Sequence, residues 1–268
     1  MSVWGNLLKK EIRLGVPTFL IPIIGFFIIC AIAGYFGNRN GIMWEALVGV
    51  VVLAIGLQAF YLAYYMFFSL QAEHKKLHLW LHSPLPAYGL LSAKLVAGLI
   101  SMLITTIIVV STGLFSITQS EMWGGVTEYI STFQLMEVGL YGGLALYLFS
   151  LSAVVWVMFF WMIFLLLSKL MNGFFSFALT AVSVIAMFLF VGWFSLTDVF
   201  ARLTEWGEIE LGHMIQSIDF ETSLTGGTEV ATETGNISFY FGTLLYETIF
   251  ALALFVITCW ILDRKIEV

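Results

Sequence analysis

Six long apolar stretches, separated by short polar segments, are the feature that most constrains how this chain folds. Each reaches or exceeds the roughly 20 residues that a helix rising about 1.5 Å per residue needs to cross about 30 Å of hydrocarbon. Only helices and closed barrels satisfy the backbone in lipid, and these stretches lack the alternation of barrel strands. We therefore predict an all-α integral membrane protein with six transmembrane helices, at residues 16–36, 44–70, 93–117, 138–167, 174–196 and 239–262.

The composition supports a single membrane domain over residues 1–268. Hydrophobic residues make up 60% of the chain and charged residues 10%, whereas a soluble domain carries about 25% charged residues. The spans leave no room for a separate soluble domain, and the first 16 residues lack the pattern of a cleavable signal. Cys30 and Cys259 both fall inside spans, where we expect them to pack as small apolar residues rather than to form a disulfide.

The distribution of basic residues predicts the orientation. Alternating six spans places both termini on one side of the membrane. Positive residues near span ends favour the cytoplasm. The basic residues on the side of the termini are Lys9, Lys10, Arg13, Lys75, Lys76, Lys94, Lys169, Arg264 and Lys265. Only Arg39 and Arg202 fall on the opposite side, so we predict that both termini are cytoplasmic.

The segment before the first span, residues 2–14, is predicted to be an interfacial helix. Trp4 and Leu8 can face the lipid boundary while Lys9, Lys10 and Arg13 meet head groups or a partner protein. Two roles remain open for this segment. It is either a basic anchor for the first span or a surface that binds a partner.

The connection between the second and third spans, residues 71–92, is the most specific cytoplasmic segment. It predicts a short amphipathic helix that stops at Pro84 and Pro86, because proline cannot continue a helix. Leu77, Trp80 and Leu81 form an apolar face at helical spacing. Such a face suits the membrane surface or a groove in another protein, and we favour a docking element.

Three histidines of this connection, His74, His78 and His82, recur every four residues and so share one stripe of the predicted helix. Two histidines at this spacing can hold zinc. No cysteine or carboxylate joins the stripe, since Glu73 points elsewhere. A polar stripe that faces a partner is therefore favoured over a metal site.

Ionisable and amide side chains inside the spans are candidates for function, because burying them in hydrocarbon is costly. Gln58 lies in the middle of the second span, and Glu247 lies about two turns into the sixth. Both are candidates for a transport pathway. For Glu247 an alternative stays open, in which its carboxyl bonds to a neighbouring helix or reaches external water. The scarcity of such residues argues against an ion-coupled transporter or channel.

The longest loop, residues 197–238, is predicted to be external. Its first part is rich enough in apolar residues to pack as short helices on the bundle. Its second part, rich in Thr and Gly, is predicted to be mobile.

No stretch matches the nucleotide-binding P-loop pattern, and no catalytic grouping falls in the spans, so the chain is not expected to be an enzyme by itself. The whole arrangement resembles the membrane subunit of an ABC exporter of the type-2 permease family. The resemblance depends on the start SVWGNLLKKEIRLG, the segment AEHKKLHLWLHSPLP, the six spans and the external loop before the last span. The HSPLP turn is its most telling local match.

The resemblance implies that the segment from Glu73 to His82 contacts separate ATPase subunits. The residues implied in this contact are Glu73, His74, Leu77, Trp80, Leu81 and His82. It also implies a second permease subunit, either the same chain or a relative. ATP and Mg²⁺ would bind to the partner ATPase and no cofactor to this chain.

The apolar bundle predicts a hydrophobic or amphipathic substrate. Resemblance to small bacterial permeases favours export of a toxic or antimicrobial peptide across the plasma membrane. Membrane lipid is an expected partner and nucleic acid is not. An ion-coupled secondary transporter, a membrane-embedded enzyme and a receptor subunit are the alternatives.

Overall fold

The computed structural model describes residues 3–74, 86–120, 132–222 and 228–266. Its helices are α1 (Val3–Asn40), α2 (Met43–Gln58), α3 (Tyr61–His74), α5 (Ala87–Gln119), α7 (Thr132–Leu170), α8 (Gly173–Ser195), α9 (Asp198–Thr204) and α10 (Phe241–Ile261). A short π-helix, η1 (Leu262–Ile266), follows α10. The two strands are β1 (Glu208–Thr222) and β2 (Thr228–Tyr240).

Five of the described helices, α1, α5, α7, α8 and α10, are long and apolar enough to cross a membrane. The pair α2 and α3 meets the same criterion when it is taken together, which gives up to six spans. Many large apolar side chains on these helices are exposed, for example Phe177 and Leu189 on α8. Water does not favour so much exposed apolar surface, so the helices indicate a multi-pass membrane protein.

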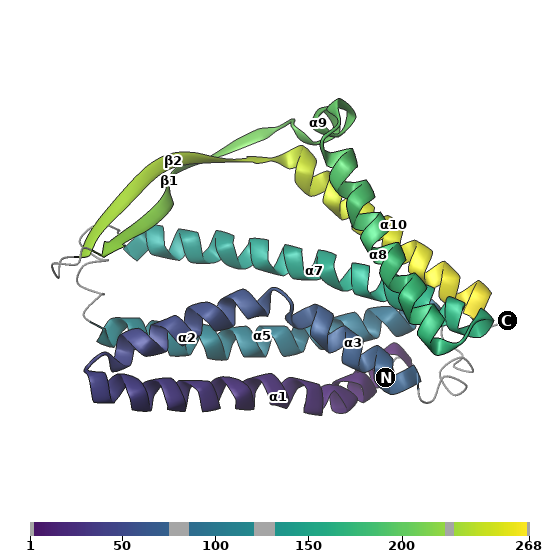
Figure 1. Ribbon diagram of the computed structural model, residues 1–268, viewed down its shortest axis with the longest axis horizontal. Coiled ribbons are helices and arrows are strands. Elements are labelled where there is room, and N and C mark those ends of the chain that lie inside the picture. The colour runs from purple at the N-terminus through teal and green to yellow at the C-terminus, as the bar shows by residue number, and fades with distance from the viewer. Residues whose placement is uncertain (1–2, 75–85, 121–131, 223–227, 267–268) are drawn as a thin grey trace.

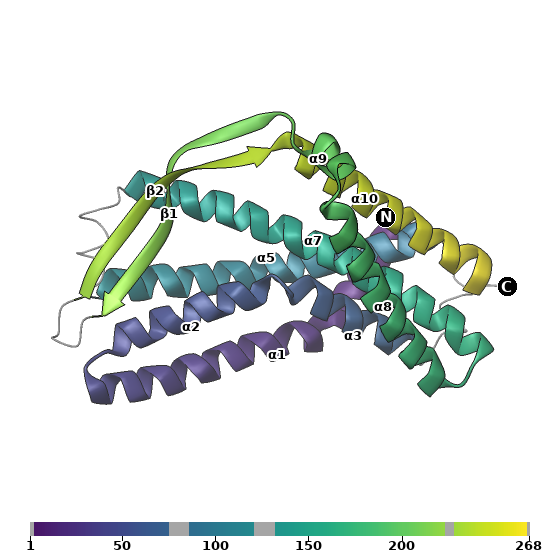
Figure 2. The ribbon, with the colours of Figure 1, turned by 45° about the horizontal axis from the view of Figure 1, so that its top comes forward.

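The second span is not the single helix predicted over residues 44–70, because α2 and α3 meet at a bend of 56°. At the bend, the amide of Ala59 bonds to the carbonyl of Gly56 and that of Phe60 to Leu57, three residues back. These tighter bonds replace regular α-helical ones for one turn. Beyond the bend, α3 continues toward the end of the molecule where both termini lie (Figures 1 and 2).

The N-terminal segment joins the first span in one continuous helix, rather than forming a separate interfacial helix over residues 2–14. Leu7 and Leu8 pack against the main core, whereas Ile12 and Leu14 on the same segment are exposed. The indole nitrogen of Trp4 donates a hydrogen bond to Ser92 Oγ on α5, at 3.4 Å. The start of α1 is therefore fixed to the bundle.

The main core lies where α3, α5, α7 and α10 meet. It includes Leu62 and Tyr65 of α3, Leu91 of α5, Met158 of α7 and Leu254 of α10. A smaller cluster joins α1, α2 and α5 further along the bundle, through the side chains Phe26, Val51 and Val109. Helix α8 lies outside both clusters, beside α7 (Figure 2).

The loop predicted to be external, residues 197–238, differs from the prediction of an all-α chain. Its first part does form a helix, α9, capped by the Thr197 hydroxyl, which accepts a hydrogen bond from the Phe200 amide. The rest forms an antiparallel hairpin that extends from α9 and α10 toward the end where α7 begins (Figure 1). Residues 223–227, within the segment predicted to be mobile, lie outside the described residues.

The hairpin was not predicted, although the sequence of its strands carries features that favour strands. Polar and apolar residues alternate over residues 208–211, with Ile209 opposite Phe239 and Leu211 opposite Ile237 in the register. β2 is rich in threonine, which favours strands. Alternation with period two and β-branched residues predict strands rather than helices.

Two glycines allow α1, α3 and α5 to approach one another around the ring of Tyr65, which is 2% exposed. A Cβ atom added at Gly15 of α1 would overlap the Tyr65 hydroxyl, and one added at Gly98 of α5 would lie 2.9 Å from its ring. Real Cβ atoms do not approach so closely. The absence of side chains at these two positions therefore sets the helix separation.

We predict that Gly15→Ala destabilises the folded chain by about 1–3 kcal/mol, because Tyr65 must move within a packed core. The measurement is thermal unfolding of the purified chain in detergent. Gly25→Ala is the matched control on the same helix, because nothing lies within 4 Å of its added Cβ. Equal melting temperatures for the two variants would contradict this packing.

Candidate functional site

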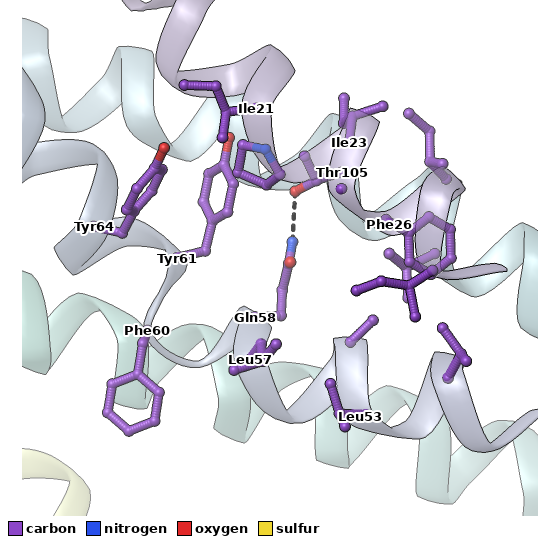
Figure 3. A pocket seen from close by; sticks show the side chains of 17 residues that line it. Ile21, Ile23, Phe26, Leu53, Leu57, Gln58, Phe60, Tyr61, Tyr64 and Thr105 are labelled. Carbon is purple, nitrogen blue, oxygen red and sulfur yellow. Dashed lines mark hydrogen bonds between the residues drawn. The ribbon is translucent and has the colours of Figure 1, made fainter. Parts of the chain in front are cut away.

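A pocket of about 430 Å³ lies beside the bend between α2 and α3, enclosed by α1, α2, α3 and α5. We call it the Gln58 pocket. Its wall is almost entirely apolar, and its lining includes Ile21, Phe26, Leu53, Leu57, Tyr61 and Ile108. Figure 3 labels Ile21, Phe26, Leu53, Leu57 and Tyr61 around Gln58. A volume of this size suits a drug-sized ligand or an apolar part of a larger one.

Gln58 supplies the main polar contact in the wall of the pocket. Its side-chain amide nitrogen lies 2.6 Å from Thr105 Oγ1, 2.9 Å from Thr106 Oγ1 and 3.1 Å from the Met102 carbonyl, all on α5. The hydroxyl of Tyr147 on α7 donates in turn to Thr106 Oγ1, at 3.1 Å. This network ties the last residue of α2 to α5 and α7 at the bend, and Figure 3 draws its bond between Gln58 and Thr105.

The rings of Tyr61 and Tyr64 belong to the first turn of α3 and point toward Ile21 of α1 (Figure 3). Their position follows from the bend, which turns the start of α3 toward α1. The pocket therefore combines a broad apolar wall with one amide and two phenol hydroxyls. Such a set binds apolar groups and orients a ligand through a small number of hydrogen bonds.

A second polar centre lies nearer the end that carries both termini, and we call it the Lys94 cluster. Lys94 of α5 is 1% exposed. Its ammonium lies 2.7 Å from Glu11 Oε2 on α1, 3.0 Å from Ser69 Oγ and 3.1 Å from Glu73 Oε1 on α3. Lys10, at the edge, lies 3.8 Å from each of the two carboxylates. The cluster joins the same three helices that Tyr65 does.

The start of α5 is also held by the C-terminal segment. The Ala87 amide, in the first turn of α5, donates a hydrogen bond to Asp263 Oδ1 at 3.0 Å. Pro86, at the N-cap position of α5, makes no side-chain hydrogen bond to the first turn of the helix. A carboxylate at a helix N-terminus is favourable because it meets free amides and the positive end of the dipole.

The structure separates the two residues predicted for a transport pathway. Gln58 lines the Gln58 pocket. Glu247 is exposed on α10, beside a different pocket of about 340 Å³ between α5, α7 and α10. The two side chains therefore do not share one site within a single chain, and a pathway role for each stays a prediction.

Most residues predicted to contact an ATPase lie outside the described residues, namely Leu77, Trp80, Leu81 and His82, together with His78. Glu73 and His74 form the end of α3. Glu73 is buried and turned toward Lys94, so its carboxylate belongs to the interior of this chain. Lys9, Lys10 and Arg13 are exposed on α1, and their contact with head groups or a partner stays a prediction.

The Lys94 cluster was not among the sites predicted from the sequence. Lys94 counted only as a basic residue near a span end, and Glu11 was not singled out. Charges of opposite sign at the ends of three successive spans are the signal that indicates such a cluster. Among the described residues, no group of three His, Cys, Asp or Glu is placed to hold a metal ion.

No protein-family model, curated protein or solved structure matches this chain. The function proposed below therefore depends on the geometry of the two polar centres and on the sequence pattern.

We predict that Lys94→Met destabilises the chain by about 3–5 kcal/mol, because it leaves two buried carboxylates without their counter-charge. Thermal unfolding in detergent measures the effect. Lys9→Met, at an exposed position, is the control. Combining Lys94→Met with Glu11→Gln and Glu73→Gln is expected to restore much of the loss. A Lys94→Met variant as stable as the control would contradict the buried cluster.

Proposed function

We propose that this chain is the membrane subunit of an ATP-driven exporter for hydrophobic or amphipathic molecules, with a peptide as the favoured substrate. A second permease subunit would complete the path, and separate ATPase subunits would supply energy. The observation that carries the proposal is the Gln58 pocket. Interrupted membrane helices are a recurrent way to build a substrate site inside a bilayer, and an apolar lining matches an apolar ligand.

The second support is that the two polar centres share helices. α1 carries Glu11 and then Ile21, while α5 carries Lys94 and then Thr105. In each helix the two residues are roughly 15–17 Å apart along the axis, at about 1.5 Å per residue. α3 likewise carries Glu73 at one end and Tyr61 at the other. A displacement at the Lys94 cluster therefore moves the walls of the pocket.

The proposed mechanism starts at the segment predicted to dock an ATPase. Residues 75–85 leave the end of α3, just after Glu73, and return to α5 at Ala87, seven residues before Lys94. ATP-driven closure of the ATPase pair would push this segment. The push would reach α1, α3 and α5 through the Lys94 cluster and reshape the Gln58 pocket, so that the substrate leaves toward the opposite side.

We predict that Gly25→Leu lowers transport of an amphipathic peptide on the order of tenfold, because the new side chain fills the pocket. Nothing lies within 4 Å of the Cβ position at Gly25, so the helix itself tolerates the change. Gly49→Leu is the control, because its Cβ position is also open and Gly49 does not line the pocket. The assay follows uptake of a fluorescent peptide into inverted membrane vesicles with ATP present. If Gly25→Leu and Gly49→Leu lower peptide transport equally, the pocket is not the site through which the peptide is transported.

We further predict that a P-loop ATPase copurifies with the chain from its native host. Trp80→Asp combined with Leu77→Asp is expected to abolish the copurification, because both residues form the predicted apolar docking face. Asn172→Ala, in the turn between α7 and α8, is the control and is expected to retain the ATPase. Peptide transport by the chain alone, driven by an ion gradient without ATP, would contradict the proposal.

A further inference from the structure

A third pocket, of about 440 Å³, opens beside the Lys94 cluster at the end of the molecule that carries both termini. It is bounded by α1, α3 and α5. Its wall is more polar than that of the Gln58 pocket, because Lys10, Glu11, Thr18, Ser69, Glu73 and Lys94 contribute to it. The cluster accounts for the contacts of Lys94 and Glu11, but it leaves those of Glu73 incomplete.

Glu73 is a buried carboxylate with spare hydrogen-bonding capacity. It is 9% exposed, and among the described residues none donates a hydrogen bond of good geometry to either of its oxygens. Lys94 directs two of its three N–H donors to Glu11 and Ser69 and lies 3.1 Å from Oε1, so Oε1 is ion-paired and Oε2 is the oxygen without a partner in the described part of the chain. A carboxylate offers about four acceptor positions, and burying them unused is costly. Both oxygens are closed to solvent, so a cationic N–H donor in the pocket reaches them only when the Glu73 side chain, which lines the pocket, turns toward it.

Lys10 supplies the opposite charge at the mouth of the pocket. Its side chain is 56% exposed and its ammonium lies 3.8 Å from both Glu11 and Glu73, beyond hydrogen-bonding distance. It is therefore held loosely and can turn toward an anion. Leu14 and Phe68, which line the same pocket, are both exposed large apolar residues. The pocket thus offers a carboxylate inside, an ammonium at the rim and an apolar flank.

We propose that this pocket binds the head group of an ethanolamine phospholipid. The primary ammonium of the lipid donates to Glu73, the phosphate contacts Lys10, and the acyl chains lie along Leu14 and Phe68. Two carboxylates and two lysines make the site neutral as a whole, which suits a zwitterion better than an anion. The exposed apolar flank favours a lipid over a free phosphoamine. This inference is independent of the proposed transport function.

A methylation series of lipids tests the proposal on the full chain in detergent. Phosphatidylethanolamine, its N,N-dimethyl derivative and phosphatidylcholine carry the same charges but three, one and no N–H donors. Binding of each lipid is measured by native mass spectrometry. We expect phosphatidylethanolamine to bind roughly tenfold more tightly than phosphatidylcholine, with the dimethyl lipid between them, because charge-assisted hydrogen bonds are lost stepwise.

Two variants locate the site. Glu73→Gln keeps the shape of the side chain and is expected to abolish the preference for ethanolamine over choline. Lys10→Ala is expected to weaken binding of phosphatidylethanolamine, whereas Lys9→Ala, at a neighbouring exposed position, leaves it unchanged. The comparison of lipids on the unaltered chain and the Lys10→Ala variant both remain informative if Glu73→Gln folds poorly.

Several outcomes would overturn the proposal. Equal binding of the three lipids would indicate non-specific annular lipid, with water completing the contacts of Glu73. Tightest binding of phosphatidylglycerol would indicate an anion site at Lys10. Full competition by water-soluble phosphoethanolamine, at the concentrations at which the lipid binds, would indicate a soluble ligand. Retention of the ethanolamine preference in Glu73→Gln would place the lipid elsewhere.

Discussion

The buried ammonium of Lys94 is the constraint from which the arrangement of the first three spans follows. A charge at this depth in an apolar bundle is stable only beside counter-charges and hydrogen-bond acceptors. Glu11 lies on α1, 83 residues before Lys94 in the chain, and Glu73 and Ser69 lie on α3. The pairing therefore selects one arrangement of α1, α3 and α5. Gly15 and Gly98 then allow these helices to close around Tyr65.

The need to give every buried polar group a partner also explains why the helix of the second predicted span can be interrupted by a bend. Backbone groups freed at a bend in lipid must be covered by protein or bonded locally. At Ala59 and Phe60 the amides bond three residues back, and the adjacent Gln58 side chain bonds to α5, which packs over the break. No proline lies at the bend, and Gly56, whose carbonyl accepts from Ala59, is the glycine nearest to it, so the bonds from Gln58 to α5 add to the local sequence in fixing its position. The Gln58 pocket is a consequence of this bend.

How much of this could be predicted from sequence depends on the range of the interactions. Hydropathy located the long apolar helices, because burial in lipid acts on each stretch separately, and Gln58 was singled out as a polar residue inside one of the predicted spans. The bend was not predicted, since it depends on Thr105 and Thr106, which are far away in the sequence. Lys94 was assigned to a span boundary for the same reason. The hairpin was missed although its alternation around Ile209 was visible, because the loop was judged by its composition.

The two polar centres differ in strength, and this difference bears on how the proposed transporter moves. The Lys94 cluster combines opposite charges in a buried setting, whereas the Gln58 network consists of neutral hydrogen bonds, which inside membrane proteins contribute about 0.6 kcal/mol each on average. A displacement applied near residue 86 therefore carries the ends of α1, α3 and α5 as one unit. The weaker contacts at the bend yield first. In the proposed mechanism, α3 would turn relative to α2 at Ala59 and Phe60, whose amides bond three residues back, and the adjoining wall of the pocket would open or close.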